Sequence, residues 1–422
     1  MSNENQTDVL IIGGGLSGLS CAVVLVEAGK TVKLLEATDR VGGRVRSDVI
    51  DGFTLDVGFQ VLLTAYPACR QLLDYEALRL RPFDPGAVIR HNDRFTTLAD
   101  PWRSPSKTLA TALNPVGSLS DKLLIAKLRR VCCRGSLEDL YNRPAMPTER
   151  YLKEFGFSNN MIDRFFRPFL GGVFLDESLS VSSRMLEFVF RMFASGDVAV
   201  PADGMGAIPR QLAERLPRGV ISLQSSVVHL DQNVATLSDG SKVSGRTVVI
   251  ATESNGAARL LQRPELATEW NQTSTLYYSA PRLAQTHKSL ILRGDESGPI
   301  QTATILSNVA PEYSPANQSL ISVSHPLQAN QQVDLDRLDH ETRAQLRCWF
   351  GDQVSKWELL QSYQIRYGVP STTLAPVVQD VRGSANGQIY VCGDHVEPPS
   401  IQGAMNSGIR VANEIVAAHR AA

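Results

Sequence analysis

Residues 8–18 read Asp8-Val-Leu-Ile-Ile-Gly-Gly-Gly-Leu-Ser-Gly18, an apolar run followed by a glycine-rich turn. An uninterrupted apolar run of this length is typical of a strand that is covered on both faces of a parallel sheet. Behind it, Gly13, Gly15 and Gly18 have the spacing G-x-G-x-x-G. This spacing carries weight only when a strand precedes it and a helix follows, so the residues around it decide its meaning.

The flanking residues supply the rest of such a unit. The pattern after the glycines predicts a helix over 16–28 that ends at Gly29, and a second strand over 31–35. Glu36 stands at the carboxyl end of that strand, 18 residues after Gly18. A strand, a glycine turn, a helix, a strand and an acid in this order predict a dinucleotide-binding unit.

Each part of the unit has a physical role in binding a dinucleotide. The first glycine allows a tight turn, the second lets a pyrophosphate approach the bare backbone, and the third lets the helix pack closely on the strand. Free N–H groups at the helix N-terminus favour phosphate, and Glu36 is placed to accept both hydroxyls of an adenosine ribose. The residues predicted to bind a cofactor here are Gly13, Gly15, Leu16, Ser17, Gly18, Glu36 and Ala37. The unit alone does not distinguish NAD from FAD.

The segment that follows reads Ala37-Thr-Asp-Arg-Val-Gly42-Gly43-Arg44. It resembles the signature of the superfamily of flavin-dependent amine oxidases, carotenoid desaturases and protoporphyrinogen oxidases. The resemblance implies that the cofactor is FAD and that the two glycines and the arginine approach its diphosphate, to which a guanidinium gives directed, charge-assisted bonds. Residues 51–58 resemble, more loosely, the family's segment toward the isoalloxazine ring, which implies a contact at Gly58.

A middle segment also resembles this superfamily. Residues 200–209 resemble its P-x-G-G-M turn, although Asp203 replaces the first of the two paired glycines. The resemblance implies that the backbone of Val227 touches the adenine; an ordinary strand valine is the equally weighted alternative.

The carboxyl end carries a third match. A strand over 388–392 ends in Gly393-Asp394, and a glycine-interrupted helix begins near Ser400. The resemblance implies that Asp394 binds the ribityl or diphosphate end of FAD. It also implies that the helix N-terminus points at the pyrimidine edge of the ring, where positive potential stabilises reduced flavin. The predicted cofactor contacts in this helix are Gln402, Gly403 and Ala404.

Three cofactor segments so far apart predict an α/β protein with a discontinuous, Rossmann-like FAD-binding domain and an inserted α+β substrate domain. We expect the FAD-binding domain to comprise residues 1–65, 196–262 and 368–422, and the substrate-binding domain to comprise 66–195 and 263–367. The first insertion is expected to be helical, at 109–113, 119–130, 137–141, 148–155, 160–166 and 182–193. In the second we expect strands at 275–280, 289–292, 302–306 and 319–324, then a helix over 335–350. Between these insertions we expect a helix over 211–216, a hairpin over 230–243 and a buried strand over 247–251.

Phenylalanine is concentrated in one stretch, because nine of the fourteen in the chain lie between residues 155 and 193. An aromatic core is the favoured interpretation, since exposed aromatic patches are costly. The alternative is that some of them line a binding site for an apolar substrate, since ligand sites are mostly apolar.

Catalytic side chains beyond the flavin are not identified by any pattern. The seven histidines show no metal-ligand spacing, so no metal is expected. His395, next to Asp394, is the polar residue best placed to face the flavin ring, with an ordinary loop histidine as the alternative. Tyr277 and Tyr278 are candidates for an aromatic cage around an amine.

These observations favour an FAD-dependent oxidoreductase that removes a hydride from a C–H or C–N bond of a small hydrophobic substrate. Oxygen or a quinone-like molecule is the expected electron acceptor, and the FAD is expected to be non-covalent. An isoprenoid-type desaturase or oxidase is the favoured activity. An amine or amino-acid oxidase, a protoporphyrinogen oxidase-like enzyme and a non-catalytic lipid carrier are the alternatives.

The composition restricts the partners and the cellular setting. The chain has 422 residues with 42 basic and 43 acidic side chains, which argues against binding nucleic acid by neutralising phosphates. Six cysteines without a CxxC pair favour a reduced, cytoplasmic setting. The segment 121–130 is apolar on one side and basic on the other, so contact with a membrane surface is an open alternative to a solvated helix face.

Overall fold

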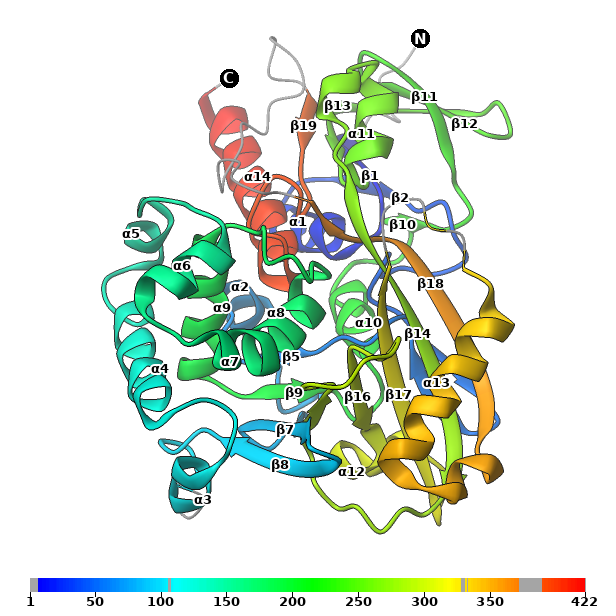
Figure 1. Cartoon of the computed structure of the whole chain (residues 1–422). Helices are drawn as coiled ribbons and strands as arrows, with labels where there is room; N and C mark the ends of the chain where they lie inside the picture. The colour runs from blue at the N-terminus through cyan, green and yellow to red at the C-terminus, as the bar shows by residue number, and fades with distance from the viewer. Residues whose placement is uncertain (1–6, 105–107, 328–330, 332, 372–388, 422) are drawn as a thin grey trace, which may run out of the picture.

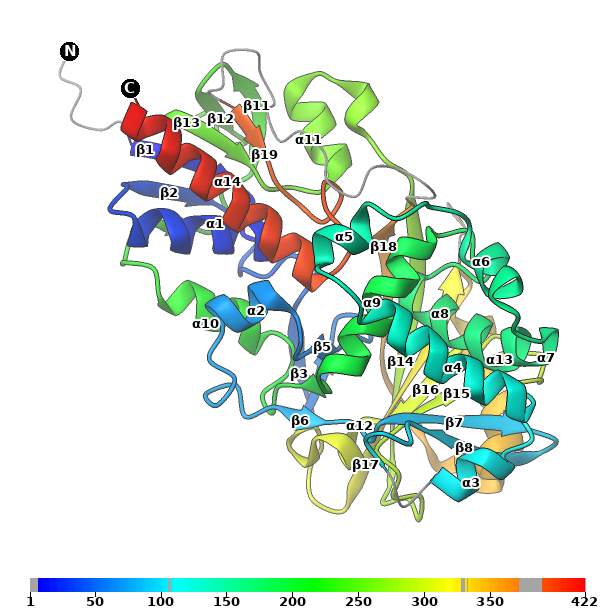
Figure 2. The same ribbon diagram turned by 90° about the vertical axis from the view of Figure 1, so that its left-hand side faces the viewer.

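A computed structural model describes residues 7–104, 108–327, 331, 333–371 and 389–421. Two seven-stranded sheets organise the molecule, with helices packed around them (Figures 1 and 2). The fold is mixed α/β, because one sheet is mainly parallel and the other mainly antiparallel. Within these described residues no helix is both long and apolar enough to cross a bilayer.

The first sheet gathers strands from the beginning, the middle and the end of the chain. Its strand order is β10-β2-β1-β13-β12-β11, and β19 pairs with β13. The parallel strands are β10 (Ile221–Ser222), β2 (Val32–Leu35), β1 (Thr7–Ile12), β13 (Lys242–Ile250) and β19 (Ile389–Val391). The antiparallel strands β11 (Val227–Asp231) and β12 (Val234–Leu237) extend it, and residues 238–241 connect β12 to β13 within the segment where a hairpin was expected. Residues far apart in sequence thus meet at one sheet edge.

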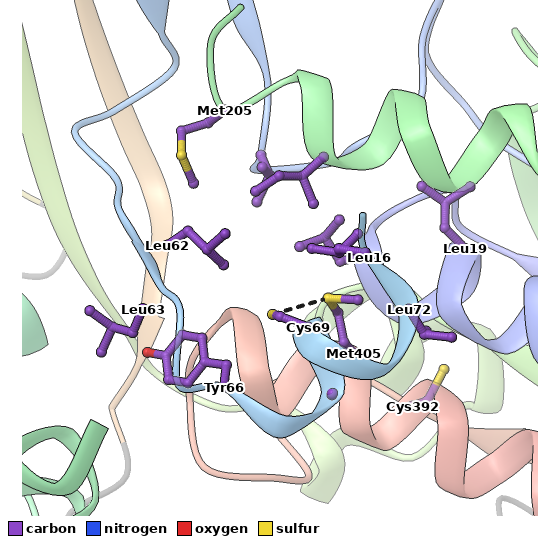
Figure 3. Packing of buried hydrophobic residues seen from close by; sticks show 14 of the residues in the cluster. Leu16, Leu19, Leu62, Leu63, Tyr66, Cys69, Leu72, Met205, Cys392 and Met405 are labelled. Carbon is purple, nitrogen blue, oxygen red and sulfur yellow. Dashed lines mark hydrogen bonds between the residues drawn. The ribbon is translucent and has the colours of Figure 1, made fainter. Parts of the chain in front are cut away.

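Helices α1 (Leu16–Glu27) and α14 (Ile401–Ala421) lie side by side next to this sheet, so the two ends of the chain pack together (Figures 1 and 2). The two helices approach at backbone distance, because a Cβ on Gly408 would overlap the carbonyl oxygen of Ser17. Next to them, α2 (Pro67–Leu72) adds Cys69, whose thiol lies 3.5 Å from the sulfur of Met405 (Figure 3). This core holds the sheet edge and the C-terminal helix in fixed positions.

The second sheet has the order β18-β14-β17-β16-β15-β7-β8 and is antiparallel except where β15 pairs with β7. Its strands are β18 (Glu358–Pro370), β14 (Trp270–Pro281), β17 (Gln318–Leu327), β16 (Thr302–Ile305), β15 (Leu290–Leu292), β7 (Gly86–His91) and β8 (Arg94–Ala99). Alternate residues face opposite sides, so Tyr278 packs with α13 (Leu335–Phe350) while Tyr277 joins the main core.

Most remaining helices form one group beside this sheet (Figure 1). They are α3 (Thr108–Leu113), α4 (Leu119–Cys132), α5 (Leu137–Tyr141), α6 (Thr148–Phe155), α7 (Asn159–Met161), α8 (Arg167–Phe174) and α9 (Ser183–Ser195). Elsewhere lie α10 (Ala207–Glu214), α11 (Ser254–Leu261) and α12 (Leu306–Val309). Short two-stranded and three-stranded sheets join β3 (Ser47–Ile50) to β4 (Phe53–Asp56), and β9 (Val198–Val200) to β5 (Leu62–Leu63) and β6 (Arg81–Pro82).

Several expectations for the first insertion and for the segment that follows it need correction. The first insertion is not wholly helical, because β7 and β8 form a hairpin that completes the second sheet. Its turn residues Asn92 and Asp93 both have positive φ, as a tight hairpin turn requires. The helix expected over 160–166 is a π-helical segment over Ile162–Phe166 that continues into α8, and α10 begins four residues before the helix expected over 211–216.

Asp56, at the end of β4, connects the short β3–β4 sheet to β14 of the second sheet and to the segment around Met205 through a buried set of hydrogen bonds. Its carboxylate accepts from Met205 N at 2.8 Å, from Ser47 Oγ at 2.5 Å and from the hydroxyl of Tyr313 at 2.9 Å. Its carbonyl oxygen accepts from the hydroxyl of Tyr277 at 2.9 Å. Burial raises the pKa of Asp56 to about 6, even though the hydrogen bonds to its carboxylate act in the opposite direction.

This shift predicts a measurable pH dependence of stability. The pKa of Asp56 is higher in the folded state than in the unfolded state. Its contribution to the free energy of unfolding is therefore fully present below about pH 4 and is lost as the pH rises through 6. The loss amounts to about 3 kcal/mol for a shift of about two units. Chemical denaturation between pH 4 and 7 should show this decline in the wild type, and Asp56→Asn should lack it. Parallel profiles for the two proteins would contradict the assignment.

Candidate functional site

One cavity of about 880 Å³ extends from the carboxyl edge of the first sheet to the helices α8 and α9 and the second sheet. Three separate parts of the chain, from its beginning, middle and end, line the cavity at the edge of the first sheet. Of the residues that sequence reasoning assigned to a cofactor, those that line the cavity are Gly13, Gly15, Leu16, Ser17, Glu36, Ala37, Gly42, Gly43, Arg44, Gly58, Val227, Gly393, Asp394 and Ala404. Gly18, Gln402 and Gly403 do not line it.

The glycines of the first turn have different physical roles. A Cβ on Gly13, whose φ is +113°, would lie 2.6 Å from the carbonyl oxygen of Ala251, and one on Gly18 would overlap the carbonyl of Gly13. Both glycines therefore allow the turn, the helix α1 and the sheet to pack at backbone distance. A Cβ on Gly15 would meet no atom within 4 Å. Gly15 keeps the cavity wall bare where α1 begins, next to the unpaired N–H groups of its first turn.

The carboxylate of Glu36 is fixed by the same turn. Its Oε2 accepts a hydrogen bond from Gly14 N at 2.7 Å, and its Oε1 accepts from the N and Oγ1 of Thr38 at 2.8 and 2.7 Å. Glu36 is buried, only 7% exposed, and lines the cavity. A carboxylate offers about four acceptor positions, so one is left for a ligand hydroxyl.

The loop with Gly42 and Gly43 lies directly against the first turn. Gly42 N donates to the carbonyl of Gly14 at 2.8 Å, and Gly42 forms an isolated bridge with Gly15. Gly42 and Gly43 have φ values of +117° and +59°, a region that favours glycine. Two stretches of bare backbone therefore meet at the same part of the cavity.

Arg44 and Asp394 form a bidentate ion pair across the cavity wall. The two guanidinium nitrogens donate to the two carboxylate oxygens at 2.5 and 2.8 Å, and the guanidinium also lies 4.9 Å from the ring centroid of Trp270. Burial of the guanidinium acts against its charge, but the Asp394 carboxylate outweighs this effect, and the pKa of Arg44 is raised. The pair connects residues 350 positions apart and puts a fixed positive charge beside the glycine loop.

The remaining residues predicted from the C-terminal helix have packing roles. The Oε1 of Gln402 accepts from Ala68 N at 2.8 Å, which anchors α14 to α2. A Cβ on Gly403 would overlap the carbonyl oxygen of Pro398. Ala404 lines the cavity one residue later, and Gly393 N donates to the Oγ of Ser407 at 2.9 Å.

The phenylalanine cluster divides between core and cavity. Phe165, Phe169, Phe174, Phe190 and Phe193 line the cavity, on the π-helical segment and helices α8 and α9. The other four pack in the core, where Phe166 and Phe188 are fully buried. The core interpretation therefore holds for these four, and whether the other five contact an apolar substrate stays a prediction.

Three side chains expected near the ring are placed elsewhere. His395 is buried and does not line the cavity, and burial lowers its pKa. Tyr277 and Tyr278 do not line it either, because their hydroxyls bond to the Asp56 carbonyl and to Asp339 inside the protein. The aromatic cage that these tyrosines were expected to supply is absent from the described cavity wall.

Several polar cavity residues were missed by sequence reasoning. They are Gln60, Glu253, Arg259, Thr273, Gln301, Thr302 and Ser324. Gln60 donates from Nε2 to the carbonyl of Arg44 at 2.8 Å, while its buried Oε1 has no hydrogen-bond partner among the described residues. No motif surrounds these residues; only the alternation of Ser322 and Ser324 along β17 indicates that one face of a strand is polar.

Comparison with known proteins identifies the family. The model of the flavin-containing amine oxidoreductases matches residues 16–416. The chain belongs to this family. The signatures in its sequence predicted this membership.

The relatives differ in their reactions and match only in part. The 4,4'-diapolycopene oxygenase of Methylomonas sp is 39% identical over 103 residues, which are 21% of this chain and 20% of that protein. The L-amino-acid oxidase of Sistrurus catenatus edwardsii is 25% identical over 307 residues, 63% of this chain and 54% of that protein. The matches thus span between a fifth and about half of these relatives.

Solved structures share the fold over nearly the whole chain. An oxidoreductase from Methanosarcina mazei has a TM-score of 0.75 at 16% identity, with 96% of this chain and all of that one covered. A putrescine oxidase variant has a TM-score of 0.75 at 19% identity, covering 98% of this chain and 99% of its own. At such identities the likeness establishes the fold.

The two kinds of glycine in the first turn should respond differently to substitution. Gly15→Ala places its methyl group in open space and should change the free energy of unfolding by less than about 1 kcal/mol. Gly18→Ala should cost about 2–3 kcal/mol because its methyl group overlaps a backbone carbonyl. Denaturant unfolding of flavin-free protein measures both, so that loss of cofactor does not contribute. Equal costs would contradict the assigned roles.

Proposed function

We propose that the cavity binds FAD non-covalently and that the enzyme removes a hydride from a C–H bond of a hydrophobic, isoprenoid-type substrate. The observation that carries this proposal is a single cavity with bare glycine backbone and a carboxylate at one end and an aromatic wall at the other. In this proposal the first sheet with α1 is the Rossmann-like part of a discontinuous FAD-binding domain (1–65, 196–262 and 368–422). The segments 66–195 and 263–367 then form the substrate domain.

The residues present fit an FAD molecule. The open space at Gly15 accepts a diphosphate next to the N-terminus of α1, where the helix dipole favours negative charge. Glu36 has an acceptor position left for a ribose hydroxyl, and a carboxylate there disfavours a 2'-phosphate. The unpartnered Oε1 of Gln60 is a further acceptor in the same wall.

The chain's own residues would bind and orient the cofactor and the substrate, and they would exclude water from the reacting bond. The Arg44–Asp394 pair offers a guanidinium that is already oriented beside the glycine loop, and Asp394 neutralises its charge in part. Bound flavin supplies the two-electron chemistry by accepting the hydride. The phenylalanines would shield the reacting bond from water and hold an apolar chain against the ring. Cys392 does not line the cavity, in keeping with a non-covalent cofactor.

Among the alternatives, an amine or amino-acid oxidase is the second candidate, because relatives of that kind match more than half of the chain. The five phenylalanines in the wall favour the isoprenoid substrate, because an apolar chain can bury its surface against them. The positions of Tyr277 and Tyr278 remove the cage that the sequence suggested. Oxygen or a quinone is the proposed electron acceptor.

Anaerobic reduction of the flavin tests the function. We expect purified protein to be yellow, to release FAD on mild denaturation, and to lose its flavin colour when a polyene or its more saturated precursor is added without oxygen. The Gly15→Val variant should fold but carry no flavin, because the valine side chain fills the space proposed for the diphosphate. It is the control for absorbance changes that do not come from bound flavin. Bleaching by amines alone would overturn the isoprenoid assignment, and colourless protein that cannot be loaded with FAD would overturn the whole proposal.

We also propose that the entrance of the cavity rests on an anionic membrane surface. The leucine face is defined by Leu109 and Leu113 on α3, Leu119 and Leu123 on α4, and Trp102, which are between 49% and 76% exposed. The ammonium group of Lys122 donates to the carbonyls of Ala112 and Asn114, which ties α4 to the end of α3. Trp102 and Lys122 also line the cavity, so the face adjoins it. Lys127 and Arg130 on α4 are exposed and give the face a charge complementary to anionic lipid.

Sedimentation with phospholipid vesicles tests this contact. Wild-type protein should pellet with vesicles that contain phosphatidylserine and less with phosphatidylcholine alone. Leu119→Ser combined with Leu123→Ser should weaken binding at least roughly tenfold because two apolar side chains no longer enter the bilayer. Val49→Ser, at a position 74% exposed on β3, is the control and should bind as the wild type does. Equal pelleting of all three proteins, or of none, would refute the proposal.

A further inference from the structure

Within the aromatic part of the cavity lies a small polar corner made of Gln301, Thr302 and Ser324. Thr302 on β16 is directly opposite Ser324 on β17, and Gln301 N donates to the carbonyl of Ser324 at 3.0 Å. All three residues line the cavity. Gln301 is 1% exposed and Ser324 is 9% exposed, so both lie deep in the wall.

Two polar atoms of this corner have no hydrogen-bond partner within the described residues. The Nε2 of Gln301 donates to the carbonyls of Pro168 and Arg167, at 3.0 and 3.3 Å. Because both partners are acceptors, they settle the orientation of the amide and leave Oε1 as its free atom. The hydroxyl of Ser324 is likewise buried without a partner. The corner thus contains a free acceptor and a group that both donates and accepts, on two residues whose backbones are hydrogen-bonded.

The corner is placed directly under the aromatic wall. A Cβ on Gly171 of α8 would lie 2.7 Å from the Nε2 of Gln301, and one on Gly172 would lie 3.1 Å from the Cγ2 of Thr302. The two glycines therefore let α8, which carries Phe169, pack directly on the corner. A ligand against the phenylalanines can reach the polar atoms without leaving the cavity.

Unpaired buried polar atoms are costly, and buried polar groups usually have partners. Most of the other unpartnered buried atoms in the described residues do not line the cavity, whereas Gln301 Oε1 and Ser324 Oγ belong to residues of its wall, where a ligand can supply the partner. A hydroxyl satisfies both, because it donates to an amide oxygen and accepts from a serine hydroxyl. A carbonyl or an ether cannot donate to Oε1. An ammonium group would bring a charge to a corner whose three side chains are neutral.

We propose that the substrate is an apolar molecule with one neutral hydroxyl group, which binds between the Oε1 of Gln301 and the Oγ of Ser324. This inference rests on the proposed function and adds the class of substrate: an isoprenoid alcohol rather than a pure hydrocarbon. The polar corner orients the chain of the substrate along the phenylalanines and so selects which C–H bond meets the flavin.

The test compares geranylgeraniol with its methyl ether on flavin-loaded protein, with dissociation constants taken from changes in the flavin spectrum. Wild-type protein should bind the alcohol roughly tenfold more tightly than the ether, because only the alcohol donates to Gln301. Ser324→Ala should weaken alcohol binding roughly fivefold without lowering the melting temperature, since the serine hydroxyl bonds to no protein atom in the described structure.

Ser322→Ala is the matched control, because Ser322 is also buried on β17 but does not line the cavity. It should leave alcohol binding unchanged. Equal affinity for the alcohol and the ether, or no effect of Ser324→Ala, would overturn the assignment, and so would failure of both compounds to bind yellow protein. These outcomes are separate from loss of the proposed function, which colourless protein would report.

Discussion

Helix α1 is held at backbone distance on two sides, and the rest of the site depends on this. On one side Gly18 lets it approach the turn at Gly13, and on the other Gly408 lets α14 approach the carbonyl of Ser17. Side chains at either position would push the elements apart. Because α14 and β19 come from the end of the chain, this packing brings Asp394 next to Arg44. The cavity wall is complete only when both ends of the chain are in place.

The cavity combines two kinds of surface. At the sheet edge the wall is bare backbone with a carboxylate and a guanidinium, which suits a charged, hydrogen-bonding cofactor. Beyond it the wall carries five phenylalanines, and Gln301, Thr302 and Ser324 form a polar corner there. In the function that we propose, the apolar part of the substrate lies against the phenylalanines, and the corner gives it a directional contact.

Asp56 shows how the short β3–β4 sheet is fixed to the second sheet and to the segment before α10. Its carboxylate takes hydrogen bonds from Ser47, Met205 and Tyr313, and its carbonyl takes one from Tyr277 of the second sheet. A buried carboxyl with a raised pKa is a cost, and the donors to the carboxylate offset part of it. The geometry between the cofactor end and the substrate end therefore depends on a few buried polar contacts as well as on the apolar core.

The local sequence was sufficient to predict which residues meet at the glycine-rich end of the cavity, because its signals are glycines and an acid at short spacing that act through the backbone. Gly13, Gly15 and Glu36 could be placed from a single strand–turn–helix unit, and the helix over 335–350 was predicted at its observed bounds. The substrate end was decided by tertiary structure alone. Which phenylalanines face the cavity, how the hairpin of β7 and β8 completes the second sheet, and why Gln301 meets Ser324 all depend on contacts between distant segments. Such contacts follow from packing of whole elements, which no local pattern encodes.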